Sequence, residues 1–356
     1  MVKKLKKLLS VLGPGFITGA SDDDPSGIAT YAQTGAQFGY QQLWTAPFSF
    51  PFMTAIQEMC GRIGLVTGKG LAGVIKKYYS KPMSYIAVLI LFTANTVNIG
   101  ANLGAMANAA SLLFNVPFIF WLMAMTILTL ALEVFISYEV YSKYLKYLAF
   151  SLFSYILVVF VVRQNWGQIF SSTILPYISL RPDYILNIVA ILGTTISPYL
   201  FFWQETEEVE EEVEKGKIMG IGRGIPKVSK RDIREMRVDT VVGMFFSNLV
   251  MFFIIATVAS TLFASGIHNI GTANQAAEAL RPLAGDFAYL LFAAGIIGVG
   301  LLSVPILAGS ASYAVSEAFG WREGLYRKFR QAHGFYGAIT VATLVGLLVN
   351  FLHIPP

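Results

Sequence analysis

Long apolar stretches recur along the chain, and each approaches or exceeds the length that crosses a bilayer. A transmembrane helix needs about 20 consecutive, mostly apolar residues. Nine stretches fit this length, at residues 9–37, 43–66, 84–113, 116–137, 145–162, 185–204, 238–265, 284–319 and 335–353. The pattern predicts an all-α integral membrane protein with about nine transmembrane helices, forming a single transmembrane domain over residues 1–356.

Two of these stretches are interrupted at their centres. The first, GPGFITGASDDDPSGIATYAQTGAQFG, places three aspartates and Pro25 at membrane depth, and the sixth, ILGTTISPYLFFWQE, has Gly193 and Pro198 in mid-span. Proline removes a helical hydrogen bond, and in lipid the freed backbone groups are tolerated only when they are buried in protein or line a cavity. Interrupted spans at matching positions of two halves indicate a transporter binding site.

The aspartates of the first interruption are the strongest candidates for a site. An intramembrane carboxylate costs about 2.5–3.5 kcal/mol, so it normally marks function. A broken helix offers carbonyl and carboxylate oxygens together, and hard divalent cations prefer such ligands. We expect Asp24 to be the main metal ligand, with Asp22 and Asp23 as outer-sphere or entrance charges. The alternative is that the aspartates only cap the second half-helix.

Polar residues elsewhere in the spans allow two interpretations. Asn95, Asn98 and Asn102 share one helical face. They either line an aqueous path or form hydrogen bonds between helices. No histidine lies in a predicted span core, and residues 83–114 contain no Asp or Glu. Because proton relays in membranes normally use Asp, Glu or His, we expect weak proton coupling or none.

Several function classes are excluded. GLVTGKG at residues 64–70 lacks the spacing and the Ser or Thr of a phosphate loop, and nothing resembles an ATPase domain. No plausible Ser/His/Asp or Cys/His arrangement is present. The sequence therefore predicts neither an enzyme nor a tightly bound cofactor, and a divalent cation would be the substrate.

Composition and charge support a membrane location. The chain is 55% hydrophobic and 13% charged, whereas soluble domains carry about 25% charged residues. The net charge of +5 could suggest nucleic acid, but all except three of the 26 Lys and Arg lie at the N-terminus or in alternate loops. The positive-inside rule predicts a multi-pass protein of the cell membrane with a cytoplasmic N-terminus. The partners are the lipid bilayer and a metal ion, not nucleic acid, and nothing sets an oligomeric state.

Residues 205–237 form the long polar stretch between the sixth and seventh apolar segments, and we expect a charged cytoplasmic loop there. The stretch begins with ETEEVEEEVE and then turns basic. Its acidic part fits a solvated helix end or, alternatively, a vestibule that attracts cations.

The two interrupted segments resemble those of the NRAMP metal transporters. GPGFITGASDDDPSGIATYAQTGAQFGY is similar to that family's first-helix pattern, an Asp-Pro-Gly-Asn signature flanked by GPGF and GAQFGY. The likeness continues into IGLVTGKGLA, and ILGTTISPYLFFWQ matches the sixth-helix pattern. The resemblance implies a leucine-transporter-type fold built from inverted repeats of five helices, with helices 1 and 6 broken. The first repeat would span about 9–162, and the second about 185–353 without its last helix.

The resemblance also implies a site. Asp24 takes the place of the family's metal-binding aspartate, and the carbonyls of Ser21 and Thr194 fall where the family uses carbonyl ligands. Two metal-binding positions are changed, because Gly27 stands where the family has Asn and Ser197 where it has Met.

Further departures bear on the choice of ion. Tyr199 and Gln204 stand where the family has histidines, and an acidic pair of the third helix aligns with Ala101 and Gly104. Loss of the soft thioether favours Mg²⁺ or Mn²⁺, with Fe²⁺ as a further candidate, and a roomier site suits hydrated Mg²⁺. The pattern is similar to the NRAMP-related magnesium transporters.

We therefore expect a secondary transporter that moves a divalent metal cation into the cytoplasm by alternating access. One alternative is a membrane-embedded sensor or scaffold that binds metal without moving it. Another is an organic-solute carrier of the same fold, which needs a positive half-helix end free to hold a carboxylate. Three aspartates at the break count against that.

Overall fold

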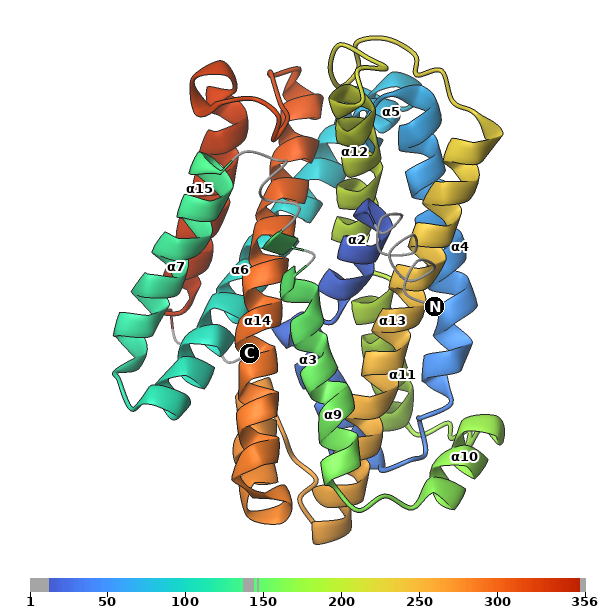
Figure 1. Ribbon diagram of the computed structural model, residues 1–356, viewed down its shortest axis with the longest axis vertical. Coiled ribbons are helices and arrows are strands. Elements are labelled where there is room, and N and C mark those ends of the chain that lie inside the picture. Colours follow the sequence, from blue (N-terminus) through green and yellow to red (C-terminus); the bar gives the residue numbers. More distant parts are fainter. Residues whose placement is uncertain (1–12, 137–143, 146, 353–356) are drawn as a thin grey trace, which may run out of the picture.

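The computed structural model describes residues 13–136, 144–145 and 147–352 (Figure 1). Within these residues the chain is helical and has no strand. Residues 9–12, 137, 146 and 353 of the expected segments lie outside the described part, as do the basic residues Lys3, Lys4, Lys6, Lys7, Lys143 and Lys146. Each expected segment contains helix in the part that the structure describes.

Both interrupted segments are broken helices. The first is split into α2 (Pro14–Asp22) and α3 (Pro25–Phe38), and the sixth into α11 (Pro182–Thr195) and α12 (Pro198–Glu214). In both, the second half begins with proline at the first helical position, where its fixed φ suits a helix and its missing N–H is not needed. Figure 1 shows α2 and α12 in the upper half of the bundle and α3 and α11 in the lower half.

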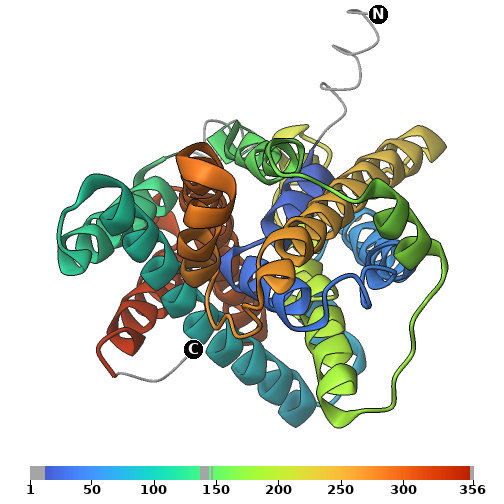
Figure 2. The same ribbon diagram turned by 90° about the horizontal axis from the view of Figure 1, so that it is seen from below.

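The other helices pack beside these four pieces, and Figure 2 shows α11 at the edge of the bundle. They are α4 (Thr45–Thr67), α5 (Leu71–Tyr78), α6 (Lys81–Phe114), α7 (Phe118–Phe135), η1 (Phe150–Leu152), α9 (Phe153–Val161), α10 (Trp166–Ile174), α13 (Lys230–Thr261), η2 (Phe263–Ser265), α14 (Ala273–Phe319), η3 (Phe329–Gln331) and α15 (His333–Val349). α14 begins before the expected start at 284 and is kinked at Gly285, whose φ is 85°.

Several of these ranges can cross a membrane by length and apolarity. They are Lys81–Phe114, Phe118–Phe135, Pro182–Glu214, Lys230–Ser265 and Ala273–Phe319. The helical segments Tyr147–Val161 and Trp166–Ile174 are long and apolar enough only when taken together, as a span bent by 120°. His333–Val349 is a shorter apolar helix. The described chain is thus a polytopic helical bundle.

α2 is fixed against α13 by close backbone contact and by one carboxylate. A Cβ on Gly19 would lie 2.3 Å from the carbonyl carbon and oxygen of Gly243, so only glycine permits this approach. Asp239 accepts hydrogen bonds from the backbone N–H groups of Gly13 (2.8 Å), Gly15 (2.8 Å) and Phe16 (3.2 Å). These are donors of the first turn of α2, which lack partners within the helix. The half-helix that leads to the aspartates is thereby anchored.

The expectation of a charged loop over residues 205–237 is wrong at both ends of that range. α12 continues to Glu214, and α13 begins at Lys230, so the loop between them covers only residues 215–229. The acidic start is not solvated, because five glutamates of α12 are at most 5% exposed. They are Glu205, Glu207, Glu208, Glu210 and Glu212.

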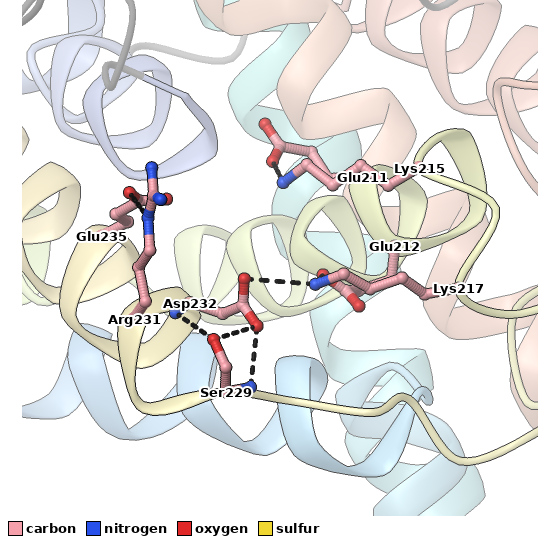
Figure 3. Close-up of polar contacts among 8 residues, drawn as sticks. All are labelled: Glu211, Glu212, Lys215, Lys217, Ser229, Arg231, Asp232 and Glu235. Carbon is pink, nitrogen blue, oxygen red and sulfur yellow. Dashed lines mark hydrogen bonds and ion pairs between the residues drawn. The ribbon is translucent and has the colours of Figure 1, made fainter.

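Two of these glutamates have donors that lie outside α12. Glu210 accepts from the Tyr313 hydroxyl (2.6 Å) and from the backbone N–H of Leu325 (2.7 Å). Glu212 pairs with Lys217 at 3.0 Å, and Lys217 also reaches Asp232 at 3.2 Å (Figure 3). Buried charges require such partners.

The start of α13 is fixed in the same region. Asp232 accepts from the backbone N–H of Ser229 at 2.7 Å, and its own N–H donates to the Ser229 hydroxyl at 3.2 Å (Figure 3). This reciprocal capping box ends the loop and begins the helix. The loop is therefore tied to both α12 and α13.

Candidate metal site

Asp24 lies at the break of the first span and caps α3. One carboxylate oxygen, Oδ1, accepts from the Gly27 backbone N–H (2.8 Å) and from the Ser26 hydroxyl (2.7 Å). The capping role considered from sequence is therefore present in the structure. It occupies only one of the two carboxylate oxygens, and the side chain is 2% exposed.

The other carboxylate oxygen of Asp24 faces α6. Oδ2 accepts from the side-chain amides of Asn98 and Asn102, each at 3.0 Å. Asn95 points elsewhere and donates to the Leu307 carbonyl (2.9 Å) and the Ser310 hydroxyl (2.8 Å) on α14. Asn98 and Asn102 therefore hold the aspartate, whereas Asn95 joins α6 to α14. Asn102 also contributes to this helix contact, because its amide lies 3.2 Å from the Ser303 hydroxyl.

Gly27 faces oxygen atoms from both broken helices. A Cβ at this position would lie 3.1 Å from the Asp22 carbonyl oxygen, 3.3 Å from the Thr194 hydroxyl and 3.4 Å from Asp24 Oδ1. Carbonyl, hydroxyl and carboxylate oxygens are ligands of hard divalent cations. Bonds from Mg²⁺ to oxygen are about 2.0–2.1 Å long. An ion here would therefore draw these groups inward or keep water between them.

The other expected ligands hold the two breaks together. The Ser21 carbonyl accepts from the Tyr199 hydroxyl at 2.8 Å, which links α2 to α12. The Ser197 hydroxyl donates to the carbonyls of Thr194 (2.8 Å) and Gly193 (3.1 Å). Both carbonyls expected as ligands, those of Ser21 and Thr194, thus accept hydrogen bonds in this conformation, and Thr194 meets Gly27 through its hydroxyl.

Gln204 forms a hydrogen bond away from the break. Its amide donates to the Thr240 hydroxyl on α13 at 2.7 Å. It also lies beside Gly61 of α4, where a Cβ would be 3.0 Å from the amide nitrogen. Gln204 therefore joins three helices in the half of the bundle that holds α12.

Asp22 and Asp23 are buried rather than placed at an entrance. Their exposures are 1% and 0%. The Ser247 hydroxyl donates to Asp22 Oδ2 at 2.7 Å and lies 3.5 Å from Asp23 Oδ1. Asp22 Oδ1 and Asp23 Oδ2 have no hydrogen-bond partner among the described residues. Burial of an ionised carboxylate is costly without a partner, so this region favours a cation or a proton.

The sequence prediction missed three contributors. Ser26 binds Asp24 from two residues away, a local pattern typical of Asp at a helix start. Ser247 shares a face of α13 with Asp239 and Gly243 at spacings of four, which was a detectable signal. The Thr194 hydroxyl could not be distinguished from its carbonyl, because that depends on how the break folds.

The site differs in kind from a cluster of metal-binding side chains. No group of three or more His, Cys, Asp or Glu side chains in the described residues is arranged to hold a metal ion. The oxygens around Gly27 instead combine one carboxylate with a hydroxyl and a backbone carbonyl. Such a set carries at most one negative charge.

Broken helices that meet at a buried oxygen site, in a polytopic bundle, define a membrane transporter fold of the leucine-transporter type. The model of the family described as "Natural resistance-associated macrophage protein-like", or Nramp, matches residues 15–356. The chain belongs to this family, and it is a multi-pass membrane protein of a family of divalent metal transporters. The expected fold class and family are thus confirmed.

Two curated relatives are named "Divalent metal cation transporter MntH". The one from Mesorhizobium japonicum is 26% identical over 329 residues, which cover 88% of this chain and 68% of the relative. The one from Deinococcus radiodurans is 24% identical over 307 residues, covering 85% and 67%.

Solved structures share the fold at lower identity. The Eremococcus coleocola manganese transporter, in complex with an aromatic bis-isothiourea compound, superposes with a TM-score of 0.79 at 18% identity, covering 98% of this chain and 71% of that one. Mhp1, a nucleobase-cation-symport-1 family transporter, gives a TM-score of 0.67 at 11% identity, covering 97% and 72%.

Proposed function

We propose that the protein moves a divalent metal cation, Mg²⁺ or Mn²⁺ in preference to Fe²⁺, across the cell membrane into the cytoplasm. The observation that carries this proposal is the set of oxygens around Gly27, drawn from both broken helices, which lie within 3.1–3.4 Å of the position that a Cβ of residue 27 would take. The names of the relatives, which are divalent metal cation transporters and a manganese transporter, support the same substrate class.

The donor set supports a preference for hard cations. The residues at the breaks present carboxylate, hydroxyl and carbonyl oxygens, and the positions of the family's Met and Asn are Ser197 and Gly27. A thioether or imidazole would favour softer transition metals, whereas oxygen ligands suit Mg²⁺ and Mn²⁺. Asp24 is the proposed direct ligand, and Asp22 and Asp23 act as outer-sphere charges.

Alternating access is the proposed mechanism, with repeats at about 9–162 and 185–353. The Tyr199–Ser21 hydrogen bond links a half-helix of one repeat to a half-helix of the other. A cation that binds the Ser21 carbonyl would compete with this bond and so shift the two repeats relative to each other. The basic loops and the N-terminus are placed in the cytoplasm.

The first test removes the proposed ligand charge. Asp24→Asn keeps the shape of the side chain and abolishes Mn²⁺ and Mg²⁺ binding, because a neutral amide is a poor ligand for a hard cation. Calorimetry in detergent measures the affinity. Asp183→Asn, the same change at an exposed aspartate paired with Arg181, is the control and keeps wild-type affinity. Unchanged affinity in Asp24→Asn contradicts the assignment.

A second experiment separates transport from binding alone. Ion-resolved uptake into proteoliposomes is expected to show Mg²⁺ or Mn²⁺ accumulation that Asp24→Asn removes. Metal binding without flux supports the sensor or scaffold instead. Affinity for amino acids in place of metals supports the organic-solute carrier, which the three buried aspartates oppose.

A further inference from the structure

An apolar groove runs along the outside of the bundle between α6, α14 and α15. It encloses 690 Å³ and is lined by side chains such as Leu89, Phe92, Phe319 and Val341. Leu89 is 65% exposed and Phe319 57%. At Gly337, which also lines the groove, an added Cβ would meet no atom within 4 Å. The groove is therefore open and accepts a hydrocarbon chain.

A second cavity of 380 Å³ adjoins one end of this groove. It is lined by Arg322, Arg330 and His333, and it shares Trp321 and Gly334 with the groove. The Trp321 ring stacks on Phe319 with centroids 5.4 Å apart. It also covers Gly334, where a Cβ would lie 2.6 Å from the ring. Trp321 thus forms the wall where the apolar groove meets the basic cavity.

The two arginines of the basic cavity are available for an anion. Arg322 and Arg330 are exposed and have no acidic partner among the described residues. The nearest acid in the chain, Glu323, is 8% exposed. Burial, with a smaller effect of Glu317 and Glu210, raises the pKa of the Glu323 carboxyl well above its usual value. Glu323 therefore competes only weakly with an external anion for Arg322 and Arg330.

We propose that the groove and the basic cavity together bind one anionic phospholipid, with an acyl chain along α6 and α15 and the phosphate on Arg322 and Arg330. Guanidinium groups bind phosphate oxygens in a planar, two-pronged geometry. Tryptophan favours the level of the lipid headgroups, where Trp321 would lie. The inference is independent of the metal site, and it uses the proposed topology to place the lipid in the cytoplasmic leaflet.

Bromine on an acyl chain quenches nearby tryptophan, which makes Trp321 a reporter. The full chain is placed in phosphatidylcholine nanodiscs with rising fractions of brominated phosphatidylglycerol or brominated phosphatidylcholine. The Trp321 signal is the difference between wild type and Trp321→Phe. We expect half-quenching at a mole fraction roughly tenfold lower for the anionic lipid, because two arginines attract its net negative charge, whereas phosphatidylcholine is zwitterionic.

Matched variants test both parts of the site. Arg322→Gln/Arg330→Gln removes the preference for the anionic lipid, whereas Arg223→Gln/Lys227→Gln, which removes two exposed charges from the loop between α12 and α13, keeps it. Gly337→Leu fills the groove and reduces quenching by both lipids. Elution volume and thermal midpoint in detergent show that each variant is folded.

Three results would overturn the proposal. If both brominated lipids quench the wild type equally, the groove makes only ordinary contact with bilayer lipids and does not select an anionic one. An equal loss of preference in both charge pairs means a general surface field. A dimeric mass by native mass spectrometry that Gly337→Leu converts to a monomer means that a second copy of the chain occupies the groove.

Discussion

Asp24 is held by neutral donors on both of its oxygens. Ser26 and Gly27 bind Oδ1, and Asn98 and Asn102 bind Oδ2. Outer partners of this kind orient a ligand and tune its affinity. Because the donors on Oδ2 come from α6, that oxygen can stay fixed while Oδ1 turns to a cation. The aspartate is thus oriented by α6 while it caps α3.

Gly27→Ala tests the space between the oxygens without changing any charge. The methyl group would lie 3.1–3.4 Å from the three oxygen atoms and would occupy the volume that an ion or its water needs. We expect metal affinity to fall at least tenfold, which corresponds to about 1.4 kcal/mol, with little change in thermal midpoint. Calorimetry measures both metals. Wild-type affinity in this variant would place the ion elsewhere.

Ser197→Met tests selectivity at the start of α12. A thioether adds a soft ligand, so we expect the ratio of Cd²⁺ to Mg²⁺ affinity to rise. The serine hydroxyl now bonds to the carbonyls of Gly193 and Thr194, and its loss also frees these two oxygens. Ser197→Ala, which is close to serine in size and also lacks the hydroxyl, is the control. Competition binding on wild type and both variants separates the effect of the added thioether from that of the lost hydroxyl. A ratio that is the same in all three shows that position 197 does not face the ion.

At the scale of elements, the glycine-rich turn before α5 serves as a carboxylate cradle. Glu317 at the end of α14 accepts from the backbone N–H groups of Gly70 (2.7 Å) and Gly73 (2.9 Å). An anion at a helix N-terminus is favoured by the exposed donors and the helix dipole. The segment GLVTGKG, which superficially resembles a phosphate loop, therefore binds a carboxylate of the same chain.

Glu317→Gln should weaken this connection between α14 and α5. The amide has one acceptor oxygen where the carboxylate has two, so one backbone donor loses its partner at a cost of about 1–3 kcal/mol. We expect a lower thermal midpoint in detergent with unchanged metal affinity. Glu214→Gln, the same change at an exposed glutamate, is expected to leave the midpoint unaltered. Equal thermal midpoints in the two variants would show that the hydrogen bonds to Glu317 do not stabilise the fold.

The two breaks could be predicted from sequence, whereas the buried acidic helix could not. Prolines and aspartates act on their own turn, so Asp24–Pro25 and Ser197–Pro198 mark the interruptions locally. The burial of Glu210 depends on Leu325 and Tyr313, which are more than 100 residues away. Because the sequence alone does not show those donors, it predicts that the run of glutamates forms a solvated surface. The same limit applies to Ser247 beside Asp22, since only the docking of α2 on α13 joins them.

At the scale of the whole molecule, the positions of the basic loops and of the two helix breaks are consistent with one arrangement of the bundle. α5 and the end of α12 lie at one end of the bundle, and α10 lies at the other (Figure 1). The proposed metal site lies between the half-helices, the position at which transporters with broken helices bind their substrates. The fold persists at 18% identity to the Eremococcus coleocola manganese transporter. We expect the choice of ion and of coupling to depend on a few site residues.

Proton coupling is the property that these site residues bear on most directly. α6 presents Asn98 and Asn102 to Asp24, and it contains no Asp or Glu. Amides hold a carboxylate but do not carry protons at neutral pH, and a membrane relay normally needs Asp, Glu or His. The unpartnered oxygens of Asp22 and Asp23 can take up a proton, and Ser247, whose hydroxyl lies against both carboxylates, does not titrate near neutral pH. We therefore expect metal transport to be weakly coupled to protons or uncoupled.

The test uses proteoliposomes that contain a pH-sensitive dye, with a metal gradient imposed from outside. Metal uptake is expected without matching acidification of the interior. Binding can still depend on pH, because a carboxylate ligand that takes up a cation must lose its proton. An affinity that falls at low pH while uptake moves no protons fits this distinction. Acidification that scales with uptake and vanishes without protein would instead establish proton symport.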